Sequence, residues 1–354
     1  MQIAGPVGSE YRVVQFHPTL RCNLRCLHCY STSAPELRDQ LSIDVLQRAV
    51  LDLWQEGFNV LSVSGGEPLL FAGLPALLRF ARSLGLITSV TTNGMLLSHR
   101  NVEMLKECAQ LVAVSLDGIP ESHNHMRANP RAFEQMSQKV QRLREAKIPF
   151  GFIFTLTLYN LNELDWVARF AVEHGATLLQ VHPLEEAGRA AAELVANAPD
   201  ELELAYAFVE VARLQTLYQG RLTIQYDVAD RDLLRTRPER AFAMNSADVE
   251  AQQLPETPLA DLVSPLILEA DGSLVPVQYG FSHAFRLCNV LDGSLRAHAV
   301  LWKQTKYPAF LELCRGVYAD LMSSDSPYPF VNWYAAICAA SRAHVAAPLE
   351  TARG

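Results

Sequence analysis

Basic residues are scarce in this 354-residue sequence, which has 30 Lys and Arg against 38 Asp and Glu and a formal net charge of −8. A surface for nucleic acid is therefore not expected, because phosphate backbones are bound by an excess of cations. One local group of arginines runs against this balance. Acidic residues are interspersed in it, so we interpret it as a solvated face; its members are Arg231, Arg235, Arg237 and Arg240.

Long apolar runs are also missing, which excludes a transmembrane helix and a membrane partner from our expectations. Residues 1–10 lack the basic and apolar blocks of a signal peptide. The sequence therefore predicts a cytoplasmic protein. Its 354 residues, 49% of them hydrophobic, suffice for one large domain or for a barrel with a smaller domain.

Cysteines are few and do not form a disulfide pattern. There are seven, an odd number, and three of them fall within eight positions, at Cys22, Cys26 and Cys29. In a cytoplasmic protein such a group indicates a metal site or catalysis rather than a disulfide framework.

Short apolar runs and amphipathic helical patterns alternate in the first half of the chain. Helices are predicted at 131–147, at 161–174 and at 42–56, where Ser42 is placed to cap the N-terminus. Strands joined by helices predict a parallel α/β sheet, and periodicity alone does not separate an open sheet from a partly closed barrel. In either fold the ligand lies at the carboxyl ends of the strands. The six strands are predicted at 11–20, 59–64, 87–92, 111–116, 150–156 and 178–182.

The pattern changes after residue 187. Residues 190–218 read as one or two helices, 264–295 as strands and turns, and 295–340 as partly helical. Three parts are expected: a barrel over 1–190, a helical linker region over 191–260, and a smaller C-terminal α+β domain over 261–354.

The three cysteines follow the first predicted strand with the spacing Cys-x3-Cys-x2-Cys. Three thiolates on one loop can bind three irons of a [4Fe–4S] cluster and leave the fourth iron open to a chelating ligand. Zinc is the alternative, and it needs a fourth ligand, for which His28 is the local candidate. Because His28 lies between two of the cysteines, it is poorly placed to complete a tetrahedron, and we expect it to face solvent or to pack.

A second motif, Ser-Gly-Gly-Glu-Pro at 64–68, follows the second predicted strand. Glycines let the backbone approach a ligand closely, and the carbonyls together with the Glu67 carboxylate can accept hydrogen bonds from an ammonium. With the cysteine loop, this motif resembles the radical S-adenosylmethionine (SAM) superfamily, over roughly residues 11–190. The resemblance implies a partial (β/α)6 TIM-like barrel, one [4Fe–4S] cluster and SAM as cofactors.

The same resemblance assigns the other residues of the SAM site. Ser115 and Asp117 would contact the ribose and carboxylate of SAM, and Arg127 would bind that carboxylate. Asn124 stands where the family has Asp, and His123 and His125 are interpreted as structural. His182 is expected either to face the barrel interior or to be a satisfied core histidine. Gly188-Arg189 is similar to a signature of the family's peptide-modifying branch. The SAM-binding residues implied are Tyr30, Gly65, Gly66, Glu67, Asn93, Ser115, Asp117, Arg127 and Val181.

Residues 264–302 resemble the start of a SPASM or twitch domain, the auxiliary-cluster module of many such enzymes. Val277 stands where that family has a cysteine, and Cys288 where it has a glycine. Since Cys314 and Cys338 stand alone, the module is interpreted as degenerate, without an auxiliary cluster. The three later cysteines are expected to be small buried hydrophobes.

The resemblance implies reductive cleavage of SAM to a 5′-deoxyadenosyl radical that abstracts hydrogen from a substrate. Maturation of a ribosomal peptide is the first hypothesis, and a small-molecule, cofactor or tetrapyrrole pathway is the second. A non-catalytic metal-binding protein is the third, and the intact Gly65-Gly66-Glu67 argues against it. A reductant such as flavodoxin or ferredoxin is the expected protein partner.

Overall fold

The computed structural model describes residues 11–238, 241 and 254–346. Ten strands form one sheet in the order β11-β10-β9-β1-β2-β3-β4-β5-β6-β7. Their bounds are β1 (Val13–Phe16), β2 (Val60–Val63), β3 (Ile87–Thr92), β4 (Leu111–Ser115), β5 (Phe150–Leu156), β6 (Leu178–Pro183), β7 (Thr223–Tyr226), β9 (Leu266–Leu268), β10 (Ser273–Pro276) and β11 (Cys288–Asn289). A separate small sheet pairs β8 (Ala229–Asp230) with β12 (Phe330–Val331).

The strands from β9 through β1 to β7 are all parallel, and β10 and β11 extend the sheet antiparallel at one edge. Because β7 and β11 end the sheet without pairing, it stays open. The predicted parallel α/β fold is confirmed, and the structure adds β7 and β9 to the six expected parallel strands. The first strand is shorter than predicted because the chain turns after Phe16 into the cysteine loop.

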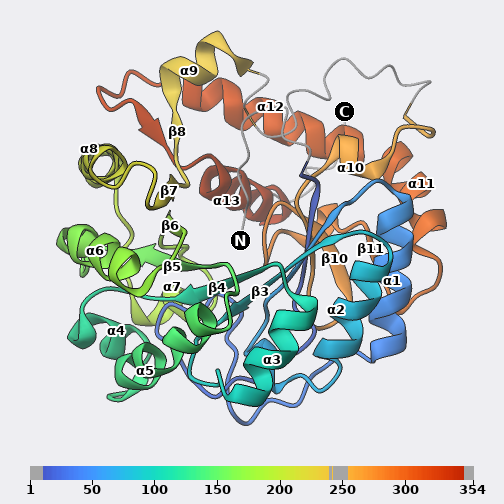
Figure 1. The fold of residues 1–354 in the computed structure, drawn as a ribbon. Coiled ribbons are helices and arrows are strands. Elements are labelled where there is room, and N and C mark those ends of the chain that lie inside the picture. Colours follow the sequence, from blue (N-terminus) through green and yellow to red (C-terminus); the bar gives the residue numbers. More distant parts are fainter. Residues whose placement is uncertain (1–10, 239–240, 242–253, 347–354) are drawn as a thin grey trace.

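Helices lie around the outside of the sheet, as Figure 1 shows for α1 to α6. The helices of the barrel half are α1 (Ile43–Gln55), α2 (Leu74–Ser83), α3 (His99–Cys108), α4 (Pro120–Met126), α5 (Ala132–Glu145) and α6 (Leu164–His174). Those that follow are α7 (Ala190–Glu193), α8 (Glu201–Leu217), α9 (Arg231–Thr236), α10 (Leu259–Leu262), α11 (Leu295–Thr305), α12 (Tyr307–Ser323) and α13 (Trp333–Ala346). Among the described helices, none combines the length and apolarity needed to cross a membrane.

The first helix shows how the sequence dictates these elements. Ser42 caps α1, and its hydroxyl accepts a hydrogen bond from Val45 N at 3.4 Å. Leu46, Val50 and Leu53 follow at helical spacing and are fully buried against the sheet. The strands behind these helices are buried on both faces, as β2 is, and the carboxyl ends of the strands are left for the site.

The C-terminal region joins the barrel through the sheet itself. Val14 of β1 pairs with Leu266 of β9, so the first strand lies between the second strand and one from far along the chain. The expected boundaries near 190 and 260 stay predictions. What the sheet shows is that residues 266–289 extend the barrel's edge.

The arginine group does not form one solvated face. Arg231 is 2% exposed, and its guanidinium pairs with Glu201 at 2.8 Å and donates to the Leu321 carbonyl. Arg235 and Arg237 are exposed, as expected, whereas Arg240 lies outside the described residues. The prediction was wrong for Arg231 because α9 turns that side chain inward between α8 and α12.

Candidate active site

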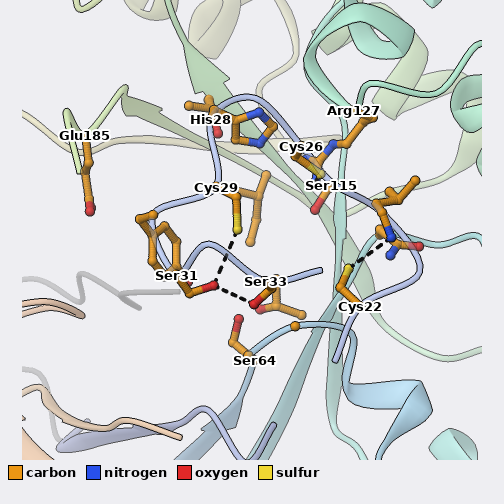
Figure 2. Close-up of a pocket in the computed structure, with 18 of the residues that line it drawn as sticks. Cys22, Cys26, His28, Cys29, Ser31, Ser33, Ser64, Ser115, Arg127 and Glu185 are labelled. Atoms are coloured by element: carbon orange, nitrogen blue, oxygen red, sulfur yellow. Dashed lines mark hydrogen bonds between the residues drawn. The ribbon is translucent and has the colours of Figure 1, made fainter. Parts of the chain in front are cut away.

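The three cysteines of the first loop face one cavity of about 1020 Å³ that opens to solvent at the carboxyl ends of the parallel strands. Figure 2 shows Cys22, Cys26 and Cys29 at its wall. Each sulfur has a polar neighbour of its own. Leu24 N donates to Cys22 Sγ at 3.4 Å, Arg127 Nη1 donates to Cys26 Sγ at 3.7 Å, and Ser31 Oγ lies 3.4 Å from Cys29 Sγ.

The spacing of these sulfurs separates the two metal hypotheses. A tetrahedral zinc ion at a Zn–S distance of about 2.3 Å holds its sulfurs about 3.8 Å apart. Among the described residues, the His, Cys, Asp and Glu groups whose ligand atoms lie within 4.8 Å of one another do not include the three cysteines, with or without His28. The donor set thus fits a group with several metal atoms, and N–H donors beside thiolates are typical of iron–sulfur sites.

The two glycines of the second motif hold the cysteine loop as well as lining the cavity. Gly66 N donates to Thr19 O at 2.8 Å, and Glu67 N donates to Arg21 O at 2.9 Å. A Cβ on Gly66 would lie 2.1 Å from Arg21 O, and Gly65 has a φ of +120°. These positions need glycine because the cysteine loop packs directly on their backbone.

Glu67 does not lie where the resemblance implied. Its side chain is fully buried and does not line the cavity. Oε1 accepts hydrogen bonds from Leu69 N at 3.1 Å and Thr92 Oγ1 at 2.7 Å, and Oε2 accepts one from Asn93 N at 2.9 Å. Burial raises the pKa of Glu67, and these donors oppose the rise. The carboxylate ties the end of β2 to the end of β3 and positions Asn93, which lines the cavity.

Asp117 also lies behind the cavity wall rather than in it. It is fully buried, and its Oδ2 accepts from Arg127 Nε at 2.6 Å. Burial opposes ionisation of Asp117, but the charge of Arg127 and the nearby imidazoles of His28 and His123 outweigh it and lower the pKa to about 2. Arg127 and Ser115 line the cavity, whereas Asp117 does not and borders it only through Arg127.

The histidines next to Asp117 differ in their placement. His123 is buried, and its Nδ1 accepts a hydrogen bond from Asp117 N at 3.1 Å, which makes it structural as interpreted. His28 lies in the cavity wall with its Nε2 3.9 Å from Asp117 Oδ1. It packs and does not face solvent.

On β6 the residue that lines the cavity is His182 and not its neighbour Val181, which was the residue expected there. Val181 is fully buried in the hydrophobic core, so its side chain cannot line a SAM site. Side chains alternate between the two faces of a strand, and His182 accordingly faces the cavity, with its Nδ1 3.5 Å from Asp227 Oδ2. Of the two placements open for His182, the structure shows the barrel interior and not the core.

Arg189 has a role that sequence reasoning missed. Its Nη1 donates to Cys26 O at 2.7 Å, its Nη2 donates to Ser33 O at 2.9 Å, and its backbone N donates to Cys29 O at 2.9 Å. A Cβ on the preceding Gly188 would lie 2.2 Å from Tyr30 O. The Gly188-Arg189 pair after β6 was the available signal, and the structure shows that it clamps the cysteine loop.

Tyr30 closes the loop against the C-terminal region. It lines the cavity, as expected, and its ring centroid lies 5.8 Å from that of His17 and 5.5 Å from that of Tyr279. The predicted residues that line the cavity are Cys22, Cys26, Cys29, Tyr30, Gly65, Gly66, Asn93, Ser115 and Arg127.

The chain is thus an open parallel α/β barrel with a three-cysteine loop at the carboxyl ends of its strands. Proteins of this architecture bind their ligands at that end of the barrel. Residues 16–171 match the family model of the Radical SAM superfamily. Its members are enzymes.

Curated relatives match about half of the chain. The chain is 32% identical over 179 residues to the Fe-coproporphyrin III synthase of Methanosarcina barkeri, covering 50% of this chain and 45% of that protein. It is 28% identical over 173 residues to the sporulation killing factor maturation protein SkfB of Bacillus subtilis, covering 49% and 42%. The chain thus spans about half the length of the curated relatives it matches.

Solved structures share the fold over more of the chain. Streptococcus suis SuiB bound to S-adenosylmethionine superposes with a TM-score of 0.65 at 16% identity, over 86% of this chain and 68% of that one. The enzyme anSMEcpe with bound AdoMet gives a TM-score of 0.62 at 19% identity, over 94% and 97%. The likeness in fold therefore includes the C-terminal region.

Proposed function

We propose that this chain is a radical SAM enzyme that acts on a peptide, with a [4Fe–4S] cluster on Cys22, Cys26 and Cys29. The observation that carries the proposal is the sulfur arrangement: three thiols from one loop face a cavity, each has its own polar neighbour, and the three sulfurs are not all within 4.8 Å of one another. When bound, the cluster and SAM supply a 5′-deoxyadenosyl radical that removes hydrogen from a substrate carbon.

The chain's own residues bind SAM and orient it in the cavity. The carbonyls and backbone of Gly65 and Gly66 line the wall nearest the cysteine loop and offer acceptors for the ammonium of SAM. Arg127, held by Asp117, offers a fixed cation for its carboxylate. Glu67 acts through Asn93, as a positioning residue. Tyr30, Leu184 and Ile153 give the cavity apolar surface that excludes water.

A peptide substrate is supported by two kinds of relative. SuiB, which shares the fold, has been solved with the precursor peptide SuiA. In Bacillus subtilis, SkfB is a sporulation killing factor maturation protein and AlbA is a biosynthesis protein of the bacteriocin subtilosin. A specific observation favours the second candidate, a tetrapyrrole-modifying enzyme: the relatives at 30–33% identity are named as heme, pre-heme or coproporphyrin synthases.

The test is cleavage of SAM by the anaerobically reconstituted protein with dithionite, and then with flavodoxin or ferredoxin as the proposed reductant. We expect 5′-deoxyadenosine, and we expect none when the three cysteines are changed to Ala. Stoichiometric zinc without iron, or reconstituted protein that forms no deoxyadenosine, would overturn the proposal. Comparing stimulation by candidate peptides with stimulation by iron coproporphyrin separates the two substrate classes.

A further inference from the structure

A second cavity, of about 710 Å³, adjoins the cysteine-lined one. The two cavities share wall residues, among them Tyr30, His182 and Glu185, so they are continuous. The second lies between the ends of β6 and β7 and the C-terminal region, where Val277, Tyr279 and α13 close it. Figure 2 shows Glu185 at the opposite side of the first cavity from Cys22. A ligand that occupies both cavities would thus extend away from the cysteines past Glu185.

The walls of this second cavity carry negative charge. Glu185 and Asp227 line it, and no Lys or Arg is among its lining residues in the described part of the chain. Asp227 Oδ2 accepts from Gln180 Nε2 at 3.0 Å and faces His182 at 3.5 Å. Arg342 lies beyond the wall on α13, with its Nη1 3.4 Å from Cys338 Sγ.

Glu185 is the less satisfied of the two acids. Within the described residues, no hydrogen bond or ion pair is made by its carboxylate, and His182 and Arg342 act on it only from a distance. Burial raises the pKa of Glu185, and these charges do not offset the rise. A half-buried carboxylate in this situation gains from a cation brought by a ligand.

Aromatic rings complete the wall. Tyr30, Tyr279 and Tyr334 line the cavity. Burial raises the pKa of each phenol, so the rings stay neutral. Neutral aromatic faces attract cations, most strongly where water is excluded. Carboxylates and aromatic faces together suit an ammonium or guanidinium and disfavour an anion.

We propose that the second cavity binds a positively charged group of the substrate, an ammonium or guanidinium, and thereby holds a neighbouring carbon at the cysteine-lined cavity. This inference rests on the proposed function and narrows its substrate to a peptide with a cationic side chain close to the carbon that reacts. Glu185 meets the cation at the junction of the cavities, and Asp227, aligned by Gln180, meets it from β7. A polyanionic substrate would meet two carboxylates there.

The experiment compares three acetylated, amidated pentapeptides that differ only at the central residue: Gly-Gly-Lys-Gly-Gly, its norleucine analogue and its glutamate analogue. Their binding to the reconstituted protein with SAM is titrated at pH 7.5 by saturation-transfer NMR. We expect the lysine peptide to bind about ten- to a hundredfold tighter than the norleucine peptide, as a charge-assisted contact provides, and the glutamate peptide to bind most weakly. Equal affinities for all three in the wild type would overturn the inference without any variant.

The variants locate the effect. Glu185→Gln and Asp227→Asn, each checked for folding by thermal unfolding, should lose most of the preference for lysine over norleucine. The exposed neighbour Glu186→Gln is the matched control and should keep it. A preference that survives in both cavity variants would place the cation elsewhere and overturn the inference. Deoxyadenosine formation by the wild type is measured in parallel: its absence counts against the proposed function alone, and its presence without charge preference counts against this inference alone.

Discussion

The three cysteines of the first loop and the three of the C-terminal region are mostly buried, yet their surroundings differ. Those of the first loop lie within eight positions, border a cavity and have polar neighbours on their sulfurs. Those of the C-terminal region sit on β11, α12 and α13 in the continuous hydrophobic core. Burial as small apolar residues, expected for Cys288, Cys314 and Cys338, is confirmed.

The comparison shows that shared burial does not make a ligand site. A thiol becomes a metal ligand when a cavity gives room for the metal and nearby donors stabilise the thiolate. Burial raises the pKa of thiols in both sets, to about 12 for Cys22 as for Cys288 and Cys314. Cys338 Sγ has a donor of its own, Arg342 Nη1 at 3.4 Å. What distinguishes the first loop is that its three sulfurs border one cavity together.

The largest effect, on iron content, should appear when each set of three cysteines is replaced in turn with Ala. The triple replacement of Cys22, Cys26 and Cys29 with Ala should remove the bound iron, which is about four atoms per chain for one cubane. Cys288, Cys314 and Cys338 changed together to Ala should leave the iron content as in the wild type. Iron and sulfide assays after anaerobic reconstitution measure both. About eight irons in the wild type would show that the C-terminal region holds a cluster after all.

The second prediction concerns Arg189, which donates hydrogen bonds to the cysteine loop from outside it. Arg189→Ala deletes guanidinium donors to the carbonyls of Cys26 and Ser33, contacts worth about 2–3 kcal/mol to the loop. We expect iron to be released to a chelator at least about tenfold faster, with the cysteines intact. Arg235→Ala, on the exposed side of α9, is the control. If release is as slow as in the wild type, the cysteine spacing alone holds the loop.

Glu67→Gln tests whether the second motif binds or positions. The amide would turn an N–H₂ toward one of the donors at Leu69, Thr92 or Asn93 and lose a buried charge-assisted bond, which costs about 1–3 kcal/mol of unfolding free energy. SAM affinity should fall in parallel, because Asn93 moves. Urea unfolding and SAM titration on the same sample decide the matter. If the variant is as stable as the wild type but binds SAM more weakly, Glu67 contacts the ammonium of SAM directly.

The smallest effect concerns pH. Burial lowers the pKa of His123 to about 3, against the attraction of Asp117, and its Nδ1 must stay unprotonated to accept from Asp117 N. The unfolded chain binds this proton below about pH 6.5, so the stability from His123 is full above that pH and falls toward pH 3. Between pH 6.5 and 5 we expect a loss of about 1–2 kcal/mol.

His123→Gln keeps an acceptor but does not titrate, so it is the matched variant for this prediction. Urea unfolding of both proteins at pH 7.5, 6.5, 5.5 and 5.0 measures the difference. The variant should show a shallower decline. Parallel declines in the two proteins would assign the pH dependence to other groups.

Most of the fold could be predicted because it rests on local signals. Most of the six expected strands are apolar runs, although Ile87–Thr92 is rich in Thr and Ser, and the expected helices have a periodic face, as in the helix capped by Ser42. The addition of β9 beside β1 could not be foreseen, since nothing in the pattern near residue 266 specifies a partner about 250 residues away.

The residues of the site that belong to contiguous sequence motifs were predicted. Those whose placement depends on contacts with distant parts of the chain were not. The cysteine loop and the glycines are contiguous motifs, and both line the cavity. Glu67 and Asp117 carry the expected residue types, but their partners Thr92, Asn93 and Arg127 occupy their carboxylates. Val181 and His182 differ only in the face of β6 on which they lie, and this depends on strand register.

The pairing of β1 with β9 also constrains how the chain is made. On the ribosome, β1 and β2 emerge before β9, so one edge of β1 stays without its partner until Leu266–Leu268 has been synthesised. Closing so long a loop makes this contact slow to form, and an unpaired parallel edge is a place where a second nascent chain can add. The order of synthesis therefore leaves the cysteine loop, which follows β1, without its C-terminal wall until that later segment has been made.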